Sequence, residues 1–229
     1  MTTKHFTRLH FQEVTSSNDL AFELVEAGQA FDGFMVVADR QSKGRGRLDR
    51  QWESPVGNLY FSLILQSEQF QSVTDYSFLI ACVIGDVLDA FGVQTQYKWP
   101  NDVMLDGKKL AGILLQLKRI NNVDNLVIGV GVNMVSCPDY AACLAGVDIS
   151  REAFLDRFEE VFEAYEVRYQ QFGFEVIRKR WKSQAFKLGD EVVLSNGVKG
   201  VFEDVDGVGN VVIVGEDGQR MKAAVAEIL

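Results

Sequence analysis

A short segment concentrates positive charge and glycine in an otherwise acidic chain. Residues 43–52 read KGRGRLDRQW, which places four cations within eight residues, while the whole chain carries a formal net charge of −9. Such a cluster repels itself unless an anion neutralises it, and guanidinium groups bind phosphate or carboxylate oxygens through paired hydrogen bonds. Gly44 and Gly46 let backbone N–H groups come close to a ligand. The segment predicts a site for a phosphate-bearing small molecule, with a solvated basic loop or a nucleic-acid contact as alternatives.

A second group of polar residues lies where the sequence predicts the end of a strand. Residues 98–102 read KWPND, and Pro100 breaks the strand, so that Asn101 and Asp102 stand at its end. There an amide can contact a base edge and a carboxylate can hold Mg²⁺. Lys109, at the start of an apolar strand, could neutralise charge that develops on a phosphoryl group. Taken singly, each of these residues could equally be a turn or surface group.

Two glycines and an asparagine interrupt a third stretch, which is otherwise apolar. These residues are Gly129, Gly131 and Asn133. Missing side chains permit the close approach of a neighbouring strand or of a flat ligand. From the residues alone, tight strand packing and a ligand surface both remain open.

Hydrophobic periodicity places these groups around one sheet. The expected strands are 4–14, 34–38, 58–65, 95–99, 102–105, 109–117 and 126–133, and the expected helices begin at the N-caps 16–18, cover 74–91 and form two runs within 151–184. From residue 188 onward, short strands at 191–195, 198–205, 210–214 and 220–224 alternate with glycine turns. The predicted fold class is α/β (α+β): a mixed β-sheet catalytic domain packed with helices over 1–184, then a small C-terminal SH3-like β-barrel over 185–229.

Composition excludes several other classes of protein. The net charge of −9 argues against a general attraction to nucleic acid or anionic lipid. No stretch is long enough to span a bilayer, and the N-terminal segment does not resemble a signal peptide. The three cysteines lack a C-x-x-C spacing, and His5 and His10 are the only histidines. We therefore expect free thiols, a reducing cytoplasmic setting and no histidine-based metal site.

Over essentially its whole length, the chain resembles the bacterial biotin protein ligases. The arginine-glycine loop of that family is similar to residues 44–52, its strand-end motif to 98–102, its lysine motif to 109–113, and its glycine-asparagine strand to 129–133. Several motifs in the right order, followed by a helical region and a small β-barrel, arise by chance far less often than any one motif.

The resemblance implies roles for individual residues. The catalytic residues would be Lys109, Arg45 and Arg47. Biotin contacts would come from Ser16, Ser17, Asn18, Gln41, Gly44, Arg45, Arg47, Trp52, Lys109, Gly112, Ile113 and Gly129. Nucleotide contacts would come from Arg47, Arg50, Trp52, Lys98, Asn101, Asp102, Gly131 and Asn133. Asp102 would also be a ligand of Mg²⁺.

The implied reaction has two steps. The biotin carboxylate attacks the α-phosphorus of ATP with loss of pyrophosphate, and biotinyl-5'-AMP then passes its acyl group to a lysine of a biotin carboxyl carrier protein with loss of AMP. ATP and biotin would be substrates, Mg²⁺ the metal, and no tightly bound prosthetic group is expected. A homodimer stays open, and neither DNA nor a membrane is expected as a partner.

Two departures from the family pattern bear on function. Asp49 stands where the family usually carries glycine, and we expect its carboxylate to pair with Arg47 or Arg50 and to weaken retention of the adenylate. Family members that act as repressors carry an N-terminal DNA-binding domain, whereas here the first predicted strand begins near Met1, so regulatory DNA binding is not expected. Lipoate ligases, which share the fold and the adenylate chemistry, are the closest alternative enzyme, and a nucleic-acid-binding module is a remote one.

Overall fold

Seven strands form one mixed sheet. The computed structural model describes residues 4–229 without the side chain of Asp49, so the predicted pairing of that carboxylate lies outside the described residues. The spatial order of the strands is β1, β2, β3, β7, β6, β5, β4. Their bounds are β1 Thr7–Phe11, β2 Phe34–Ala38, β3 Leu59–Ser67, β4 Gln96–Lys98, β5 Asp102–Leu105, β6 Lys108–Ile120 and β7 Val123–Val132. β1 and β2 run parallel and the other neighbouring pairs are antiparallel, which gives the predicted mixed sheet.

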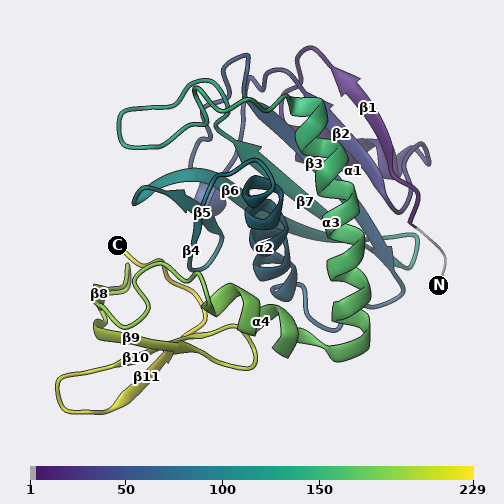
Figure 1. Ribbon diagram of the computed structural model, residues 1–229. Helices are drawn as coiled ribbons and strands as arrows, with labels where there is room; N and C mark the ends of the chain where they lie inside the picture. The colour runs from purple at the N-terminus through teal and green to yellow at the C-terminus, as the bar shows by residue number, and fades with distance from the viewer. Residues whose placement is uncertain (1–3) are drawn as a thin grey trace.

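The helices cover the two faces of this sheet unequally. α2 (Asp75–Asp89), α3 (Arg151–Phe172) and α4 (Phe174–Lys182) share a large core with one face. Figure 1 shows α2 and α3 side by side in front of the sheet. α1 (Ser17–Glu26) packs on a smaller core at the other face. Part of that second face is therefore left without a helix.

The uncovered part of the α1 face carries glycines. Val127 of β7 belongs to the α1 core, and alternate residues of a strand share a face, so Gly129 and Gly131 point to the same side. On β6, Gly112 pairs directly with Gly131 across the ladder. The sequence thus leaves a shallow space on this face, beside α1, without a gap in the backbone ladder.

A second, four-stranded antiparallel sheet forms the C-terminal barrel. Its strands are β8 (Glu191–Val193), β9 (Lys199–Val205), β10 (Val211–Val214) and β11 (Arg220–Ala223), in the spatial order β11, β10, β9, β8. In Figure 1 the barrel lies beside α4 and the β4 end of the main sheet.

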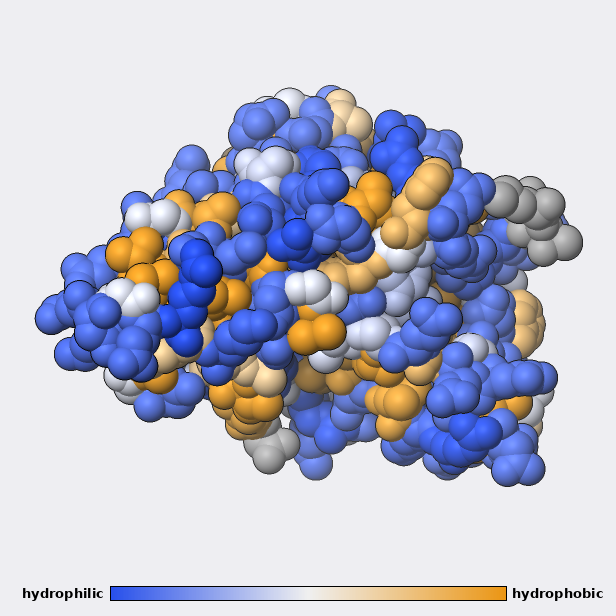
Figure 2. Space-filling view, turned by 90° about the horizontal axis from the view of Figure 1, so that it is seen from below, coloured by the Kyte–Doolittle hydropathy of each residue, from blue (hydrophilic) through white to orange (hydrophobic). Residues whose placement is uncertain are grey.

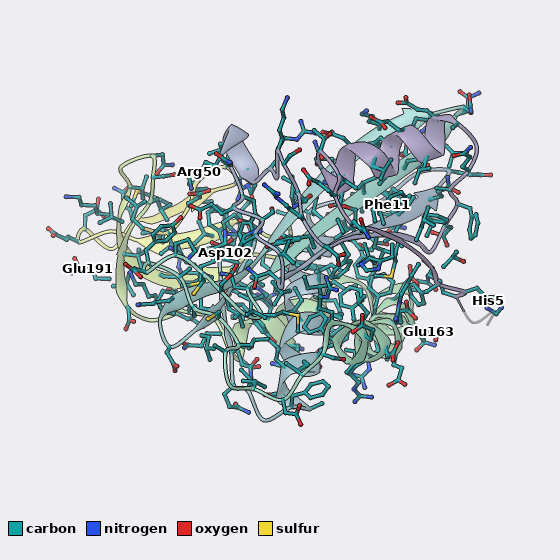
Figure 3. All side chains as sticks on the ribbon, turned by 90° about the horizontal axis from the view of Figure 1, so that it is seen from above. His5, Phe11, Arg50, Asp102, Glu163 and Glu191 are labelled. Atoms are coloured by element: carbon teal, nitrogen blue, oxygen red, sulfur yellow. The ribbon has the colours of Figure 1, made fainter. Side chains whose placement is uncertain are left out.

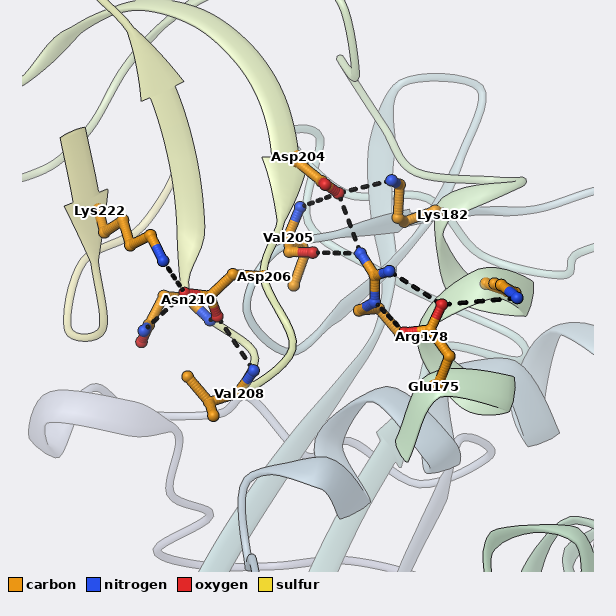
Figure 4. Close-up of polar contacts among 10 residues, drawn as sticks. Glu175, Arg178, Lys182, Asp204, Val205, Asp206, Val208, Asn210 and Lys222 are labelled. Atoms are coloured by element: carbon orange, nitrogen blue, oxygen red, sulfur yellow. Dashed lines mark hydrogen bonds and ion pairs between the residues drawn. The ribbon is translucent and has the colours of Figure 1, made fainter. Parts of the chain in front are cut away.

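Polar contacts brace the barrel against α4 and against the main sheet. Arg178 of α4 donates to the Val205 carbonyl over 2.7 Å and pairs with Asp204 (Figure 4). The indole N–H of Trp99 donates to the Gly209 carbonyl over 3.0 Å. The barrel is therefore in direct contact with the strand-end motif.

The predicted fold class is confirmed, with two local differences. β1 is shorter than the predicted strand 4–14, because beyond its end Val14 keeps only an isolated bridge to Gln41. The long polar loop contains a single 3-10 turn, η1 (Arg47–Asp49). The sequence did not predict this turn, because the loop is rich in glycine and arginine and shows no helical periodicity.

The molecular surface is mainly polar on the face that Figure 2 presents. Hydrophilic side chains cover most of it, interrupted by small apolar groups. Exposed apolar residues of this kind are normal for a protein surface. Among the described residues, no helix is long and apolar enough to cross a membrane.

Candidate active site

A cavity of about 330 Å³ gathers the predicted motifs. It lies between the start of α1, the glycine positions of β6 and β7, the strand-end motif and the loop 43–52. In Figure 3, Arg50 and Asp102 lie close to the barrel, whereas His5 and Glu163 lie at the opposite end of the molecule. Segments distant in the sequence thus meet at one site.

The floor of the cavity is flat because glycines face each other across two strands. Trp52 lies over the Gly112–Gly131 pair: an added Cβ would approach the indole to 2.6 Å at Gly131 and to 2.9 Å at Gly112. The ammonium of Lys109 lies 5.1 Å from the centroid of the same ring. The indole N–H is buried and has no hydrogen-bond partner among the described residues. An unpaired buried donor costs free energy, so a ligand that brings an acceptor to this N–H would be favoured.

One end of the cavity consists of neutral hydrogen-bonding groups. Gln41 Oε1 accepts from the backbone N–H and the hydroxyl of Ser17 over 2.8 and 3.1 Å, and Gln41 Nε2 donates to Ser54 Oγ over 3.0 Å. Ser62 Oγ, fully buried in β3, lies 2.7 Å from the Ser17 hydroxyl and 2.6 Å from Asn18 Oδ1. Because a buried polar network is stable only when its members are paired, these contacts fix the orientation of Ser17 and Gln41 at the cavity wall.

The other end of the cavity carries Lys109 and Asp102. Lys109 Nζ lies 2.7 Å from Asp102 Oδ1. That oxygen is buried, and its contact with the ammonium lacks hydrogen-bond geometry. A phosphate can therefore compete for the ammonium, which would leave the carboxylate free to bind a cation.

Lys98 adds a third polar group at this end. Burial lowers the pKa of Lys98, and the nearby cations Lys187 and Lys109 lower it further, whereas Asp102 and Glu227 oppose the shift. The side chain is thus a cation whose charge is less stable than that of an exposed lysine.

The three arginines of the loop 43–52 each have a protein partner. Arg45 pairs with Asp19 of α1, Arg47 Nη1 donates to Asn101 Oδ1 over 3.2 Å, and Arg50 Nη1 donates to Glu227 Oε2 over 2.7 Å. Arg50 is 62% exposed, and ion pairs so open to water contribute little stability. An anionic ligand can therefore replace these partners and bind the guanidinium groups with only a small loss of free energy.

The carboxylate of Asp102 fits the magnesium ion that the family resemblance implies. Mg²⁺ is usually held by one or two carboxylates together with substrate phosphates. A buried carboxylate oxygen without a hydrogen bond, at the cationic end of the cavity, is such a donor. Within residues 4–229 as described, no group of three or more His, Cys, Asp or Glu could hold a metal by itself. The ion would therefore need the phosphates of a nucleotide as further ligands.

All predicted site residues except Gly44 line the cavity. A Cβ at Gly44 would lie 2.5 Å from both Ser54 Oγ and the Trp52 carbonyl oxygen, so this glycine lets the loop fold on itself and lies away from the ligand space. Ile113 contributes only backbone, because its side chain packs in the core on the other face of the sheet.

Two asparagines that the resemblance assigned to the nucleotide use their amide donors within the protein. Asn101 Nδ2 donates to the Ile113 carbonyl over 2.7 Å, and Asn133 Nδ2 donates to the Ala142 carbonyl over 3.0 Å. In this state they brace the cavity wall, and Asn101 offers Arg47 its oxygen.

The sequence interpretation missed several lining residues. The missed residues include Glu227 near the C-terminus and three residues of the segment 138–141: Pro138, Tyr140 and Ala141. Nothing in their local sequence marks them. Ser62, which bonds to Ser17 and Asn18 from behind the cavity wall, gave a usable signal. It is a polar residue between Phe61 and Leu63 in an apolar strand, where a buried hydroxyl needs partners.

Comparisons with known proteins agree with this geometry. The sequence model of the Biotin/lipoate A/B protein ligase family matches residues 10–133. The chain is 32% identical over 206 residues to the biotin–(acetyl-CoA-carboxylase) ligase of Paracoccus denitrificans, covering 81% of this chain and 86% of that protein. The chain belongs to the biotin/lipoate A/B protein ligase family.

Other members of the biotin/lipoate A/B protein ligase family extend the comparison. The bifunctional ligase/repressor BirA of Bacillus subtilis is 34% identical over 196 residues, which are 79% of this chain but 60% of that longer protein. The structure of biotin protein ligase from Aquifex aeolicus in complex with biotin and ATP superposes with a TM-score of 0.85 at 27% identity, covering 97% of both chains. The small barrel is thus part of the shared architecture.

Proposed function

We propose that this chain is a biotin protein ligase that forms biotinyl-5'-AMP from biotin and ATP and then transfers biotin to a lysine of a carrier protein. The observation that carries the proposal is the polarity of one cavity. A neutral hydrogen-bonding end at Ser17 and Gln41 is joined, over a flat glycine floor, to a cationic end at Arg47, Lys98 and Lys109. This order matches a ligand with a neutral ring at one end and a carboxylate that meets a phosphate at the other. The relatives named for biotin and the related complex with biotin and ATP support the same assignment.

The neutral end suits the ureido ring of biotin. A urea presents one carbonyl acceptor and two N–H donors in a plane, and hydroxyl and amide groups can serve both. Ser16, Ser17, Asn18 and Gln41 line this end, and the bonds from Ser17 to Gln41 and from Ser62 to Asn18 fix three of them before a ligand arrives. Gly129 lets the Asn18 amide lie close to the sheet at this end, since an added Cβ there would overlap that amide.

The cationic end suits the first chemical step. A carboxylate oxygen of biotin attacks the α-phosphorus, the bond from that phosphorus to the α,β-bridging oxygen breaks, and pyrophosphate leaves with that oxygen. Two anions must approach each other, so Arg45, Arg47 and Lys109 act by holding both and by neutralising the charge that accumulates at phosphorus. Bound Mg²⁺ would supply further neutralisation of phosphate oxygens, with Asp102 as its protein ligand.

The second step needs an amine and a protected anhydride. A carrier lysine attacks the acyl carbonyl of the adenylate, AMP leaves with the carboxyl oxygen, and the amine loses its proton. Trp52, which lies over the glycine floor, can cover the adenylate and keep water away until the lysine arrives.

Partner, location and domain limits are part of the same proposal. The carrier would be a domain of a biotin-dependent carboxylase, as the name of the Paracoccus denitrificans relative suggests for that protein. The edge strands β1 and β4 could form the contact surface for either a carrier protein or a second copy of the chain. Free thiols at all three cysteines suit a cytoplasmic location. A domain limit near residue 185 is supported by the change from α4 to the short barrel strands.

The test is transfer of labelled biotin to a carboxyl-carrier domain in the presence of ATP and Mg²⁺, with lipoate as the competing acid. We expect labelling of one carrier lysine that requires ATP and falls sharply in Arg47→Ala. The matched control is Arg40→Ala, which removes an exposed arginine outside the cavity lining. Transfer of lipoate in place of biotin would assign the chain to the sister activity, and formation of no adenylate from either acid would refute the proposal.

A further inference from the structure

The segment that follows β7 forms one wall of the cavity. Pro138, Tyr140 and Ala141 line the cavity. The wall is tied to two site residues: the backbone N–H of Ala142 donates to the Lys109 carbonyl over 2.9 Å, and that of Leu144 donates to the Asn133 carbonyl over 3.0 Å. A change in the freedom of this segment therefore acts directly on the cationic end of the site.

Two of the three cysteines stand at the ends of this wall. Cys137 and Cys143 are both half-buried and free. The Cys137 thiol donates to the Ala141 carbonyl over 3.5 Å, and the Cys143 side chain lies next to that thiol. The turn between them, closed by the bond from the Ala141 N–H to the Pro138 carbonyl over 2.9 Å, brings the two ends together. The third cysteine, Cys82, is fully buried in α2 and has no part in this arrangement.

We propose that Cys137 and Cys143 are a redox modification site, a dithiol that a low-molecular-weight disulfide such as oxidised glutathione converts to an intrachain disulfide across the cavity wall. One thiolate attacks a sulfur of oxidised glutathione and releases one glutathione. The second thiolate then attacks the protein sulfur of the mixed disulfide and releases the other glutathione. The two cysteines lose two electrons and two protons, and one oxidised glutathione becomes two reduced molecules.

The surroundings of the pair set its reactivity. Burial and the adjoining Cys143 raise the pKa of the Cys137 thiol. Because the thiolate is the attacking species, the disulfide forms slowly at neutral pH and faster as the pH rises. The nearby thiol favours closure of the ring once the first mixed disulfide exists, since the second attack is intramolecular.

The disulfide restrains the wall. A cross-link between residues 137 and 143 removes open conformations of the short loop that it closes. The amides of Ala142 and Leu144, which bond to the Lys109 and Asn133 carbonyls, then open less often. Ligands that must pass Tyr140 at the rim enter and leave more slowly.

The experiment oxidises the full chain with oxidised glutathione at mildly alkaline pH and maps the thiols by mass spectrometry. We expect the peptides that contain Cys137 and Cys143 to be joined with loss of two hydrogen atoms. Hydrogen–deuterium exchange at Ala142 and Leu144 should slow severalfold and recover on reduction with dithiothreitol. Cys82→Ser should behave like the parent, whereas Cys137→Ser should take up glutathione at Cys143 and keep its exchange rates.

Two outcomes would overturn the proposal: glutathione adducts on both cysteines with no intrachain bond, or a disulfide that leaves the exchange of both amides unchanged. A third readout, the rate of biotinyl-5'-AMP formation and release, should fall severalfold on oxidation and rests on the proposed function. If the reduced chain forms no adenylate, the proposed function fails while mass and exchange measurements still decide the redox site.

Discussion

The two sides of the cavity are held in different ways. On the floor, Gly112, Gly129 and Gly131 belong to strands that pair along their whole length within the sheet. On the opposite side, the loop 43–52 is tied to its surroundings by a backbone bond from Lys43 to Thr15, by Trp52 on the floor and by arginine side chains. Of these arginines, Arg45 and Arg50 are 41% and 62% exposed. Exposed ion pairs are each worth at most about 1 kcal/mol.

The difference assigns the two sides different tasks. Because the strands of the floor are held rigidly in the sheet, the floor determines where the biotin ring and the reacting phosphorus lie. A loop with weak and replaceable partners can exchange Asp19 or Glu227 for an anionic substrate and then cover it. A substitution that pushes against a buried group fixed beside the floor should therefore change both folding and catalysis. A substitution in the loop, or one on the floor that pushes against a loop side chain, should change catalysis with little effect on folding.

The largest effect is expected at Lys109, where the floor meets the cationic end. Lys109→Ala should lower kcat/KM for adenylate formation by about 100-fold or more, because a preorganised donor at developing charge is typically worth that much. Lys108→Ala is the matched control, because Lys108 is the exposed neighbour of Lys109. Among the described residues, the Lys108 ammonium bonds only to the Asp139 carbonyl. Pyrophosphate release in single-turnover assays measures the step, and equal rates for the two variants would remove Lys109 from the chemistry.

A pair of glycine substitutions tests the rigidity of the floor against that of the loop. Gly129→Ala places a Cβ on the buried amide of Asn18, which is bonded to Ser62, so its network must shift. We expect the free energy of unfolding to fall by about 1–3 kcal/mol, as for overpacking elsewhere, and KM for biotin to rise. At Gly131 the three nearest atoms to an added Cβ all belong to Trp52, a loop side chain that can move away.

For Gly131→Ala we expect almost unchanged stability and a raised KM for ATP. Urea unfolding gives the stability of both variants, and steady-state kinetics give the two KM values. Equal destabilisation by both substitutions would contradict the contrast between floor and loop.

Local patterns in the sequence predicted the sheet, the helices and the polar motifs of the cavity, because charge clusters and hydrophobic periodicity are local signals. The lining residues at 16–18 and 41 came from the family resemblance. The alternation of a strand could also have placed Ile113 on the face opposite Gly112. Glu227 could not be found this way, since it reaches the cavity only because Trp99 and Arg178 hold the barrel in place. At Gly44 a permissive backbone does not say whether a ligand or the loop itself makes the close approach, and in the structure Ser54 Oγ and the Trp52 carbonyl oxygen lie close to it.

A smaller effect should appear in the pH dependence of nucleotide use. Burial lowers the pKa of Lys98, so the free enzyme loses this charge at a lower pH than an exposed lysine would. The ligand-free fold gains stability as the pH rises through the lowered pKa, up to the pKa of the unfolded chain, because the unfolded state then binds more protons. Nucleotide binding changes in the opposite direction, since the cation that attracts phosphate disappears.

Lys98→Arg keeps its charge throughout and should move the alkaline limb of kcat/KM for ATP to higher pH, a parameter that reports groups of the free enzyme. Lys108→Arg is the control, because Lys108 is an exposed lysine on β6 of the same sheet. Alkaline limbs that coincide in the parent and Lys98→Arg would show that Lys98 does not contribute its charge to nucleotide binding.

The smallest effect is expected at the contact between the loop and the barrel. Glu227→Gln removes the anionic partner of an exposed arginine, so the free energy of unfolding should change by no more than about 0.5 kcal/mol. Arg50 is then free for phosphate and a negative charge at the cavity wall is gone, so KM for ATP should fall modestly. Glu191→Gln, which makes the same change on an exposed position of the barrel, should leave KM unaltered. If Glu227→Gln instead destabilises the fold by several times that amount, the loop is held as firmly as the floor, and its partners are structural ties that a substrate cannot displace.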